Sequence, residues 1–494
     1  MKTNTLDFDA QALREKILDL AMRGKLVPQD PNDEPASVLL EKIKAEKEQL
    51  IKDKKIKKSK PLAPITDDER PFDIPDSWEW VRLGDVNTYN SESVHPDRTP
   101  DKTFELYSVP IFPTRKPEII KGEEIRSNKQ AVETGDVLLC KINPRINRVW
   151  KVSNFTDNEN IASTEWIVVR QREITTEYLR YSLMAPYFRN LLQSNVSGVG
   201  GSLTRAKPRE VRNYVLPIPP LSEQSRIAAK IAQLFALLRK VESSTQQYAQ
   251  LQTLLKSKVL DLAMRGKLVE QDPHDEPASV LLEKIKAEKE QLVKEGKIKK
   301  SKPLPPIADD EKPFDIPDSW EWVRLGNLTA PVEYAMADGP FGSNLKKADY
   351  TLNPEVRIIQ LSNIGDNGWK NNNVKYTTFE HLKAIQRSEV YPGNIVIAKM
   401  MPAGRAIIVP NNDKKYVLSS DAVKFIPNEL LNKIFLLFCI NSDVYRDQVN
   451  SKLQGTTRPR TSLKKLKSFI LPIPPVKEQK RILIKLLLLR QDLI

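Results

Sequence analysis

The sequence predicts an α/β protein: two α/β domains in a pseudo-two-fold arrangement, joined by long antiparallel coiled-coil helices and related by a circularly permuted internal repeat. Three observations predict this fold. A long segment of the first half returns almost unchanged in the second half, a shorter motif also occurs twice, and apolar residues follow a coiled-coil spacing between Ile227 and Leu262. The chain of 494 residues also exceeds one ordinary domain, which has roughly 100–200 residues.

The longer repeat begins at DLAMRGKLV from Asp19 and recurs from Asp261, at an offset of 242 residues. Through Gly84, 58 of 66 positions are identical to their counterparts. The shorter repeat, NYVLPIPPLSEQSRI and SFILPIPPVKEQKRI, has an offset of 255 residues. Two inserts, Asp85–Arg212 and Asn327–Lys467, lie between the repeated segments and share little beyond GDVLLCKINP and GNIVIAKMMP. Near-identical arms therefore frame two divergent domains, either to present two variable surfaces or as the record of a recent duplication.

The two offsets make the repeat circular. Ile494 corresponds to Arg239 at one offset, whereas Met1 corresponds to Ser243 at the other. We therefore expect the two termini to lie close together, with the N-terminal segment completing the second unit.

A long helix is predicted from Leu221, directly after Pro219 and Pro220, to Gly266. Roughly 44 residues in this helix would span about 66 Å. Its seam steps by four and three through Ile227, Ile231, Leu234, Leu238, Val241, Thr245, Tyr248, Gln252, Leu255, Val259 and Leu262. An ordinary long core helix is the alternative.

The two ends of the chain continue the same seam. The residues concerned are Ile482, Leu486, Leu489 and Leu493 at the C-terminus, and Leu6, Ala10, Leu13, Ile17 and Leu20 at the N-terminus. We expect both terminal helices to lie antiparallel against the central one.

Each long helix is followed by a helix-like segment, Val38–Leu50 or Val280–Leu292, then by a lysine-rich run and an extended proline-rich connector. The inserts alternate short apolar runs with turns and end in the helix-like stretches Glu177–Gln193 and Asn432–Lys452, which predicts small curved sheets with helices. We divide the chain into an N-terminal helix (1–27), an arm with its connector (28–75), a first variable domain (76–218), a central helix (219–269), a second arm (270–317), a second variable domain (318–474) and a C-terminal helix (475–494).

Lys and Arg total 78 against 64 Asp and Glu, which gives a net charge of +14 and favours a polyanionic partner. Two-fold symmetry also suits the reading of two DNA half-sites. Cys140 and Cys439 lie in apolar runs and are expected to be buried thiols of a reducing compartment. No signal peptide and no long apolar span are apparent, so we expect a cytoplasmic protein without a membrane partner.

Motifs for catalysis are missing from the sequence. It contains no phosphate-binding G-x-x-x-x-G-K-[ST] loop, no G-x-G-x-x-G and no Asn-Pro-Pro followed by an aromatic residue. His95, His274 and His381 are scattered along the chain. We therefore expect no catalytic residue and no metal site.

Cations gather in a glycine-containing segment before each PIPP motif, Ser197–Arg212 and Gln454–Lys467. Backbone amides, hydroxyls and cations suit phosphate oxygens, and an arginine that reaches the groove suits a guanine edge. The candidate DNA-binding residues are Arg205, Lys207, Arg209, Arg212, Arg458, Arg460, Lys464 and Lys465, with a weaker second set of Lys141, Arg145, Arg148, Lys399 and Arg405. A solvated loop is the alternative for the first set, and lysine stems buried at a sheet edge are the alternative for Lys141 and Lys399.

The segments LPIPPLSEQSRIAAKI and LPIPPVKEQKRI, each after an insert, resemble the specificity (S) subunit of type I restriction-modification systems. LAMRGKLV and PDSWEWVRLG resemble the conserved regions of one branch of that family. The resemblance covers essentially the whole chain. It implies that the inserts are target-recognition domains, each reading half of an asymmetric bipartite sequence in double-stranded DNA, and that the helices dock two methyltransferase (M) subunits. Motor-nuclease (R) subunits would join the full complex, and S-adenosylmethionine, ATP and Mg would bind those partners rather than this chain.

Two other classes fit the same residues. One is a non-catalytic coiled-coil scaffold whose inserts bind proteins, and the other is a nucleic-acid-binding protein without sequence preference. A steep salt dependence of DNA binding would exclude the scaffold. Competition by unrelated duplex would separate specific from unspecific readers.

Overall fold

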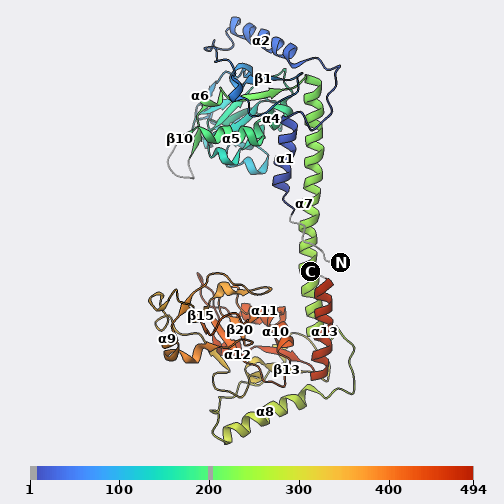
Figure 1. Ribbon diagram of the computed structural model, residues 1–494, viewed down its shortest axis with the longest axis vertical. Coiled ribbons are helices and arrows are strands. Elements are labelled where there is room, and N and C mark those ends of the chain that lie inside the picture. Colours follow the sequence, from blue (N-terminus) through green and yellow to red (C-terminus); the bar gives the residue numbers. More distant parts are fainter. Residues whose placement is uncertain (1–7, 198–203, 493–494) are drawn as a thin grey trace. The chain divides into compact units, whose positions relative to one another are not determined.

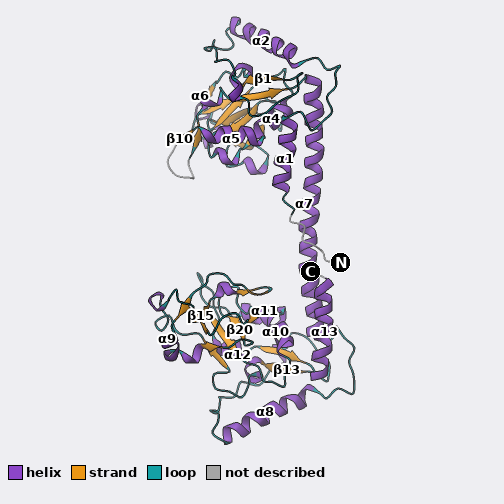
Figure 2. Cartoon of the chain, viewed as in Figure 1, coloured by secondary structure: helices purple, strands orange, loops and turns teal. Residues whose placement is uncertain are grey.

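The computed structural model describes residues 8–197 and 204–492, which form two compact units (Figure 1). The first unit holds residues 8–246 and the second holds residues 247–492. Helix α7 (Leu221–Met264), 44 residues long, begins in the first unit and ends in the second. Its bounds confirm the predicted central helix, and the helices and sheets within each unit confirm the α/β class (Figure 2).

The helices of the first unit before α7 are α1 (Ala10–Met22), α2 (Ala36–Lys52), α3 (Leu83–Val86), α4 (Thr176–Met184), α5 (Pro186–Ser194) and α6 (Pro208–Val211). Those of the second unit after α7 are α8 (Ala278–Lys294), α9 (Phe379–Ala384), α10 (Lys433–Asn441), α11 (Asp443–Ser451), α12 (Leu463–Ser468) and α13 (Val476–Asp492). Helices α2 and α8 confirm the helix-like arm segments. Each helix-like stretch at the end of an insert is two helices rather than one, because the chain breaks before Pro186 and at Ser442.

The first insert forms a five-stranded sheet in the order β2-β5-β8-β3-β4 and a three-stranded sheet in the order β7-β6-β9. Their bounds are β2 (Ser93–Val94), β3 (Thr103–Tyr107), β4 (Glu118–Lys121), β5 (Lys129–Ala131), β6 (Val137–Cys140), β7 (Val149–Lys151), β8 (Glu159–Ser163) and β9 (Trp166–Val169). The second insert forms four-stranded sheets in the orders β18-β15-β22-β19 and β14-β23-β20-β21. Their bounds are β14 (Met336–Asp338), β15 (Val356–Ile359), β18 (Tyr376–Thr377), β19 (Glu389–Val390), β20 (Ile395–Ala398), β21 (Ala406–Ile408), β22 (Tyr416–Leu418) and β23 (Ala422–Phe425).

The two divergent inserts share one strand order. Strand β3 runs parallel to β8, and β4 and β5 flank this pair as antiparallel neighbours. In the second insert β15 runs parallel to β22, and β18 and β19 flank them in the same way. The smaller sheet β7-β6-β9 likewise matches β21-β20-β23. Positions in the two inserts can therefore be compared one with another despite their different sequences.

The repeated motifs on either side of each insert pair with each other. Strand β1 (Glu79–Arg82) lies antiparallel to β12 (Val215–Ile218), and β13 (Glu321–Arg324) lies antiparallel to β24 (Ile470–Ile473). The EWVR segment before each insert thus forms a two-stranded ribbon with the VLPI or ILPI segment after it. This pairing brings the two ends of each insert together. We call the repeated segments on either side of the inserts the frame, because they are nearly the same in both units.

A buried glutamate of the repeated PIPP-x-x-EQ motif fastens the frame from inside. The Trp78 indole nitrogen donates to Glu223 Oε2 over 2.9 Å, and Gln29 Nε2 donates to Glu223 Oε1 over 2.5 Å. The same indole bond joins Trp320 to Glu478 over 2.9 Å. Burial raises the pKa of both glutamates above the ordinary value. The Glu of the motif is therefore a structural anchor.

The terminal helices pack on α7 within each unit. In the first unit Arg14 of α1 pairs with Glu242, while Asp33, further along the chain, pairs with Arg226. The order is antiparallel, as predicted. In the second unit Ile482 of α13 is buried in the core that also includes Val259 of α7.

The predicted seam is buried at its start and exposed in its middle. Ile227 and Ile231 are fully buried, whereas Val241, Tyr248 and Leu255 are exposed. The partners predicted for this middle stretch include Leu6 and Leu493, and these residues and both chain ends lie outside the described residues. The expectation that the terminal helices continue the seam here therefore stays a prediction.

Candidate nucleic-acid interface

Strand β6 of the first insert domain and strand β20 of the second each lead into a turn. In both domains this turn lies beside the basic segment that precedes the PIPP motif. In the first insert domain the Lys141 carbonyl, directly after β6, accepts from the Ala206 amide over 2.8 Å. In the second the Lys399 carbonyl, directly after β20, accepts from the Thr461 amide over 2.9 Å. The structure therefore brings the two predicted cation sets together in both domains. Residues 198–203 of the first glycine-containing segment lie outside the described part.

The cations differ in their access to solvent. Those exposed are Arg205, Lys207, Arg209, Arg212, Arg458, Arg460, Lys464 and Arg145. Those half-buried are Lys141, Arg148, Lys399, Arg405 and Lys465. The Lys465 amine donates to the Lys452 carbonyl over 2.6 Å, and Arg405 pairs with Asp366 over 2.9 Å. The exposed group is therefore the better suited to phosphate oxygens, and the role of each residue stays a prediction.

A carboxylate lies between the two cation sets of the first domain. Glu165 Oε2 is 3.9 Å from the Lys141 amine and 3.4 Å from Arg205 Nε. All three side chains are partly open to solvent, so each attraction is modest. Glu165 nonetheless offsets positive charge where a phosphate would bind.

The second domain uses the equivalent position differently. Asp421 corresponds to Glu165, because its carbonyl accepts the Lys399 amide over 2.8 Å, as the Glu165 carbonyl accepts the Lys141 amide over 3.1 Å. The Lys399 amine, however, pairs with Asp338 of β14 over 2.6 Å. We call the turn after β6 or β20, with the basic segment beside it and the residue before β9 or β23, the corner of its domain. The two corners share their backbone hydrogen bonds and differ in their ion pairs.

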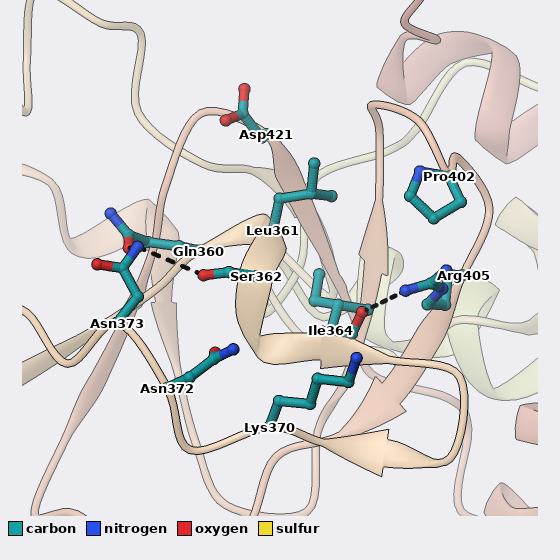
Figure 3. Close-up of a pocket in the computed structure, with 10 residues that line it drawn as sticks. All are labelled: Gln360, Leu361, Ser362, Ile364, Lys370, Asn372, Asn373, Pro402, Arg405 and Asp421. Carbon is teal, nitrogen blue, oxygen red and sulfur yellow. Dashed lines mark hydrogen bonds between the residues drawn. The ribbon is translucent and has the colours of Figure 1, made fainter. Parts of the chain in front are cut away.

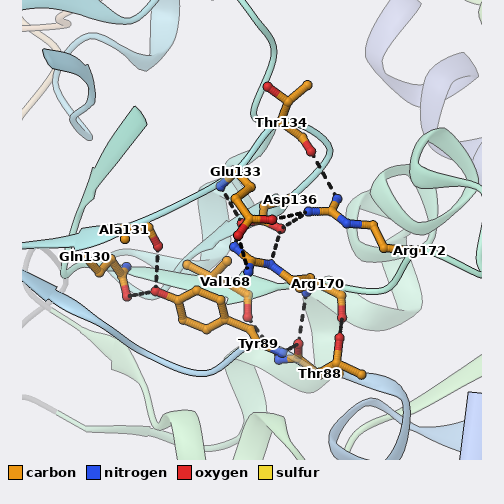
Figure 4. Close-up of polar contacts among 11 residues, drawn as sticks. Thr88, Tyr89, Gln130, Ala131, Glu133, Thr134, Asp136, Val168, Arg170 and Arg172 are labelled. Carbon is orange, nitrogen blue, oxygen red and sulfur yellow. Dashed lines mark hydrogen bonds and ion pairs between the residues drawn. The ribbon is translucent and has the colours of Figure 1, made fainter. Parts of the chain in front are cut away.

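An ion-pair network around the buried Asp136 holds β6 of the first domain in place (Figure 4). Arg170 donates to Asp136 through Nε over 2.8 Å and through Nη2 over 2.7 Å. Asp136 also accepts the Glu133 amide over 2.8 Å, which closes the turn before β6. The Arg170 carbonyl accepts from the Thr88 hydroxyl over 3.0 Å. The network therefore fixes the start of the strand that leads to Lys141.

The second domain has a hollow of about 580 Å³ beside its basic turn (Figure 3). Its lining is rich in amide groups and consists of Gln360, Leu361, Ser362, Ile364, Lys370, Asn372, Asn373, Pro402, Arg405 and Asp421. Arg405 alone among them was a predicted DNA-binding residue. A polar residue directly after the apolar strand VRII, and the run Asn371–Asn373, are the signals that could have found the others.

The residues that the structure describes contain no group of three or more His, Cys, Asp or Glu side chains placed to hold a metal ion. Within residues 8–197 and 204–492, every helix is too short or too polar to span a bilayer. Cys140 and Cys439 are buried and free, as predicted.

Comparison with known proteins gives consistent matches. The family profile "Type I restriction modification DNA specificity domain" matches residues 75–252 and 340–492. The specificity subunit of the type I restriction enzyme EcoEI of Escherichia coli is 32% identical, covering 96% of this chain and 88% of that protein. The EcoAI specificity subunit of Escherichia coli is 34% identical, covering 97% of this chain and 88% of that protein.

Two solved structures share the fold. A chain from work on complex assembly and conformational transition of the type I R-M system aligns with a TM-score of 0.61 at 22% identity, covering 86% of this chain and 92% of that one. The HsdS subunit from Thermoanaerobacter tengcongensis aligns with a TM-score of 0.50 at 21% identity over the same shares.

Proposed function

The chain belongs to the type I restriction-modification DNA specificity family, and on this premise we propose that each insert domain reads one half of an asymmetric bipartite DNA target. The observation that carries the proposal is that the two domains share a strand order while the equivalent corners bear different side chains. Glu165 in the first domain faces two cations, whereas Asp421 in the second lines a hollow. Two surfaces that differ in this way suit two different half-sites.

The exposed cations of each corner would bind the phosphate backbone. Arg209 and Arg212 follow strand β11 (Arg205–Ala206) of the first domain, and Arg458 and Lys464 belong to the basic segment of the second. Contacts to phosphates hold a protein in register on the duplex, and contacts to base edges carry the specificity. The family match, rather than these cations, supports a specific reader over a sequence-independent one.

The long helices would dock two methyltransferase subunits. Exposed apolar side chains support this role: on α7 Leu251 and Leu254 are exposed, the latter by 66%, and on α13 Leu488 is exposed. A solvent-facing apolar surface of this kind is typical of protein interfaces. In this arrangement the chain supplies recognition, and the partner subunits, together with motor-nuclease subunits, supply catalysis and bind S-adenosylmethionine, ATP and Mg.

The direct test is a genome-wide map of adenine methylation, by long-read sequencing, in the host with and without this gene. We expect one bipartite motif to lose its methylation on deletion. Replacing residues 85–212 by the insert of another family member should then change one half of the motif. A change in both halves would contradict the two-domain proposal, and a map that deletion leaves unchanged would favour the scaffold.

A further inference from the structure

The hollow of the second insert domain is formed by two segments that approach the basic turn. Gln360 directly follows β15, and Asn372 and Asn373 precede β18. Pro402 and Arg405, which also line the hollow, belong to the turn after β20. The hollow is therefore continuous with the surface proposed to meet DNA.

Two amide side chains in the hollow are joined to each other. Asn373 Nδ2 donates to Gln360 Oε1 over 2.5 Å and to the Ser362 hydroxyl over 3.4 Å (Figure 3). This bond fixes which atoms remain free. Among the residues that the structure describes, neither Gln360 Nε2 nor Asn373 Oδ1 has a hydrogen-bond partner. One donor and one acceptor thus lie side by side on the lining of the hollow.

The segment that carries these amides is held from below by buried polar groups. Asn363, fully buried, donates to the carbonyls of Lys370 over 3.0 Å and of Asn372 over 2.7 Å. Arg357, also buried, donates to the same Asn372 carbonyl over 3.2 Å. Such support from locked, buried side chains is what keeps a recognition group in position before its ligand arrives.

We propose that Gln360 and Asn373 together read an adenine in one half of the DNA target. Adenine presents an acceptor, N7, beside a donor, the N6 amine, in the major groove, and amide side chains are the usual partners of that pair. Gln360 Nε2 donates to N7, and Asn373 Oδ1 accepts from the N6 amine. The inference rests on the proposed function and adds a residue-level assignment to it.

The assignment applies to one half of the target. Ser108 follows β3 as Gln360 follows β15, since β3 pairs with β8 as β15 pairs with β22. A serine at this position is shorter and has no amide. The first domain therefore lacks the Gln360 amide at this position, and the pair reads a base in the second domain's half-site.

Selection from a random duplex library tests this assignment. The protein is the full chain, purified together with its accompanying subunits. Gln360→Glu keeps the acceptor that Asn373 needs and replaces the free donor by an acceptor. We expect the preference for adenine at one position to fall by about 5- to 150-fold, the range of a good bidentate base contact. Cytosine should gain at that position, because its N4 amine suits a carboxylate.

Two further variants complete the design. Asn373→Ala should weaken the adenine preference at the same position. It also provides a second test if thermal unfolding shows that Gln360→Glu does not fold. Asn371→Ala is the matched control, because Asn371 is an exposed neighbour that does not line the hollow. Its selected motif should equal that of the wild type.

The outcomes separate the two proposals. If the wild-type chain selects no bipartite motif, the proposed function is wrong. If the wild type selects one and both Gln360→Glu and Asn373→Ala leave it unchanged, the function stands and the adenine assignment is wrong. A loss that appears in both halves would also overturn the assignment, since the two residues belong to one domain.

Discussion

The two insert domains have one strand order and two different surfaces, while the frame that holds them is nearly the same twice. In the frame, Trp78 bonds to Glu223 as Trp320 bonds to Glu478, each over 2.9 Å. At the corners, by contrast, Glu165 and its counterpart Asp421 have different surroundings. The difference teaches that the residues that hold the fold are separate from those that form the corner surfaces, so that a surface can change while the frame stays intact.

The strongest test of the constant frame is the removal of its buried indoles. Trp78→Ala and Trp320→Ala each delete a 3%-exposed ring and leave a buried glutamate without its indole donor. We expect each to lower the free energy of unfolding of its own unit by about 3–5 kcal/mol. Urea unfolding gives the size of the loss, and hydrogen exchange assigns it to a unit. Clearly unequal losses would show that the two copies of the frame are not equivalent.

The next test exchanges a variable feature between the domains. Asp136 and Arg170 of the first domain correspond to Asn394 and Ile426 of the second, since β6 pairs with β9 as β20 pairs with β23. Asp136→Asn should keep the turn, because Asn394 closes its own turn through the Tyr391 amide over 3.0 Å. It breaks a buried ion pair, and we expect a loss of about 3 kcal/mol.

The double variant Asp136→Asn/Arg170→Ile is the control for that experiment. It reproduces the uncharged pair that the second domain already uses, so most of the lost stability should return. Both variants are compared by urea unfolding. A double variant as unstable as the single one would mean that Arg170 is needed for packing and that the two corners are not interchangeable.

The sequence predicted the constant parts better than the variable ones. Helix α7 and the arm helices α2 and α8 follow from periodicity and caps, which are local signals. The exposure of Tyr248 does not follow from such local signals, because the seam pattern does not say how far each partner helix extends.

The hollow of the second domain could not be predicted from the sequence, for a different reason. Gln360 and Asn373 are 13 residues apart in the sequence and belong to no motif. Their meeting depends on the pairing of β15 with β18 and on the left-handed backbone of Asn373, with φ of 47°. The cations Lys141 and Arg205 were both predicted as DNA-binding residues, but their shared carboxylate Glu165 was not, because only the antiparallel pairing of β6 with β9 brings it beside Lys141.

A smaller effect is expected from the carboxylate at the first corner. Glu165→Gln removes the counter-charge of Lys141 and Arg205, so the affinity for duplex DNA should rise by about fivefold, or about 1 kcal/mol. The slope of log affinity against log salt should steepen by about 1 for each additional phosphate contact. Asp421→Asn is the comparison, and it should change the affinity less because no ion pair of Asp421 occurs in the described residues. Equal effects would mean that both carboxylates act by net charge alone.

The smallest effect concerns a pair that the frame repeats, and acid should reveal it. The hydrogen-bonded Arg82 guanidinium lowers the pKa of Glu69 to about 2, and Arg324 lowers the pKa of Glu311 in the same way. A lowered carboxyl pKa stabilises the fold above the ordinary value of 4.5, and this stability is lost as the pH falls from there toward 2. Glu69 is 38% exposed, so solvent screening limits its contribution to less than about 1 kcal/mol.

Glu69→Gln and Glu311→Gln should therefore lower the melting temperature slightly at pH 7, and by the same amount, because both pairs have a distance of 2.7 Å. The difference from the wild type should shrink as the pH is lowered through 4 to 3, where the wild-type carboxylates begin to lose their charge. A difference that is constant with pH would mean that the glutamines disturb packing rather than charge. Unequal shifts would be traced to the Thr66 hydroxyl, which also bonds to Glu69 over 3.2 Å and has no counterpart at Ala308, because the arginine–glutamate distances of the two pairs are the same.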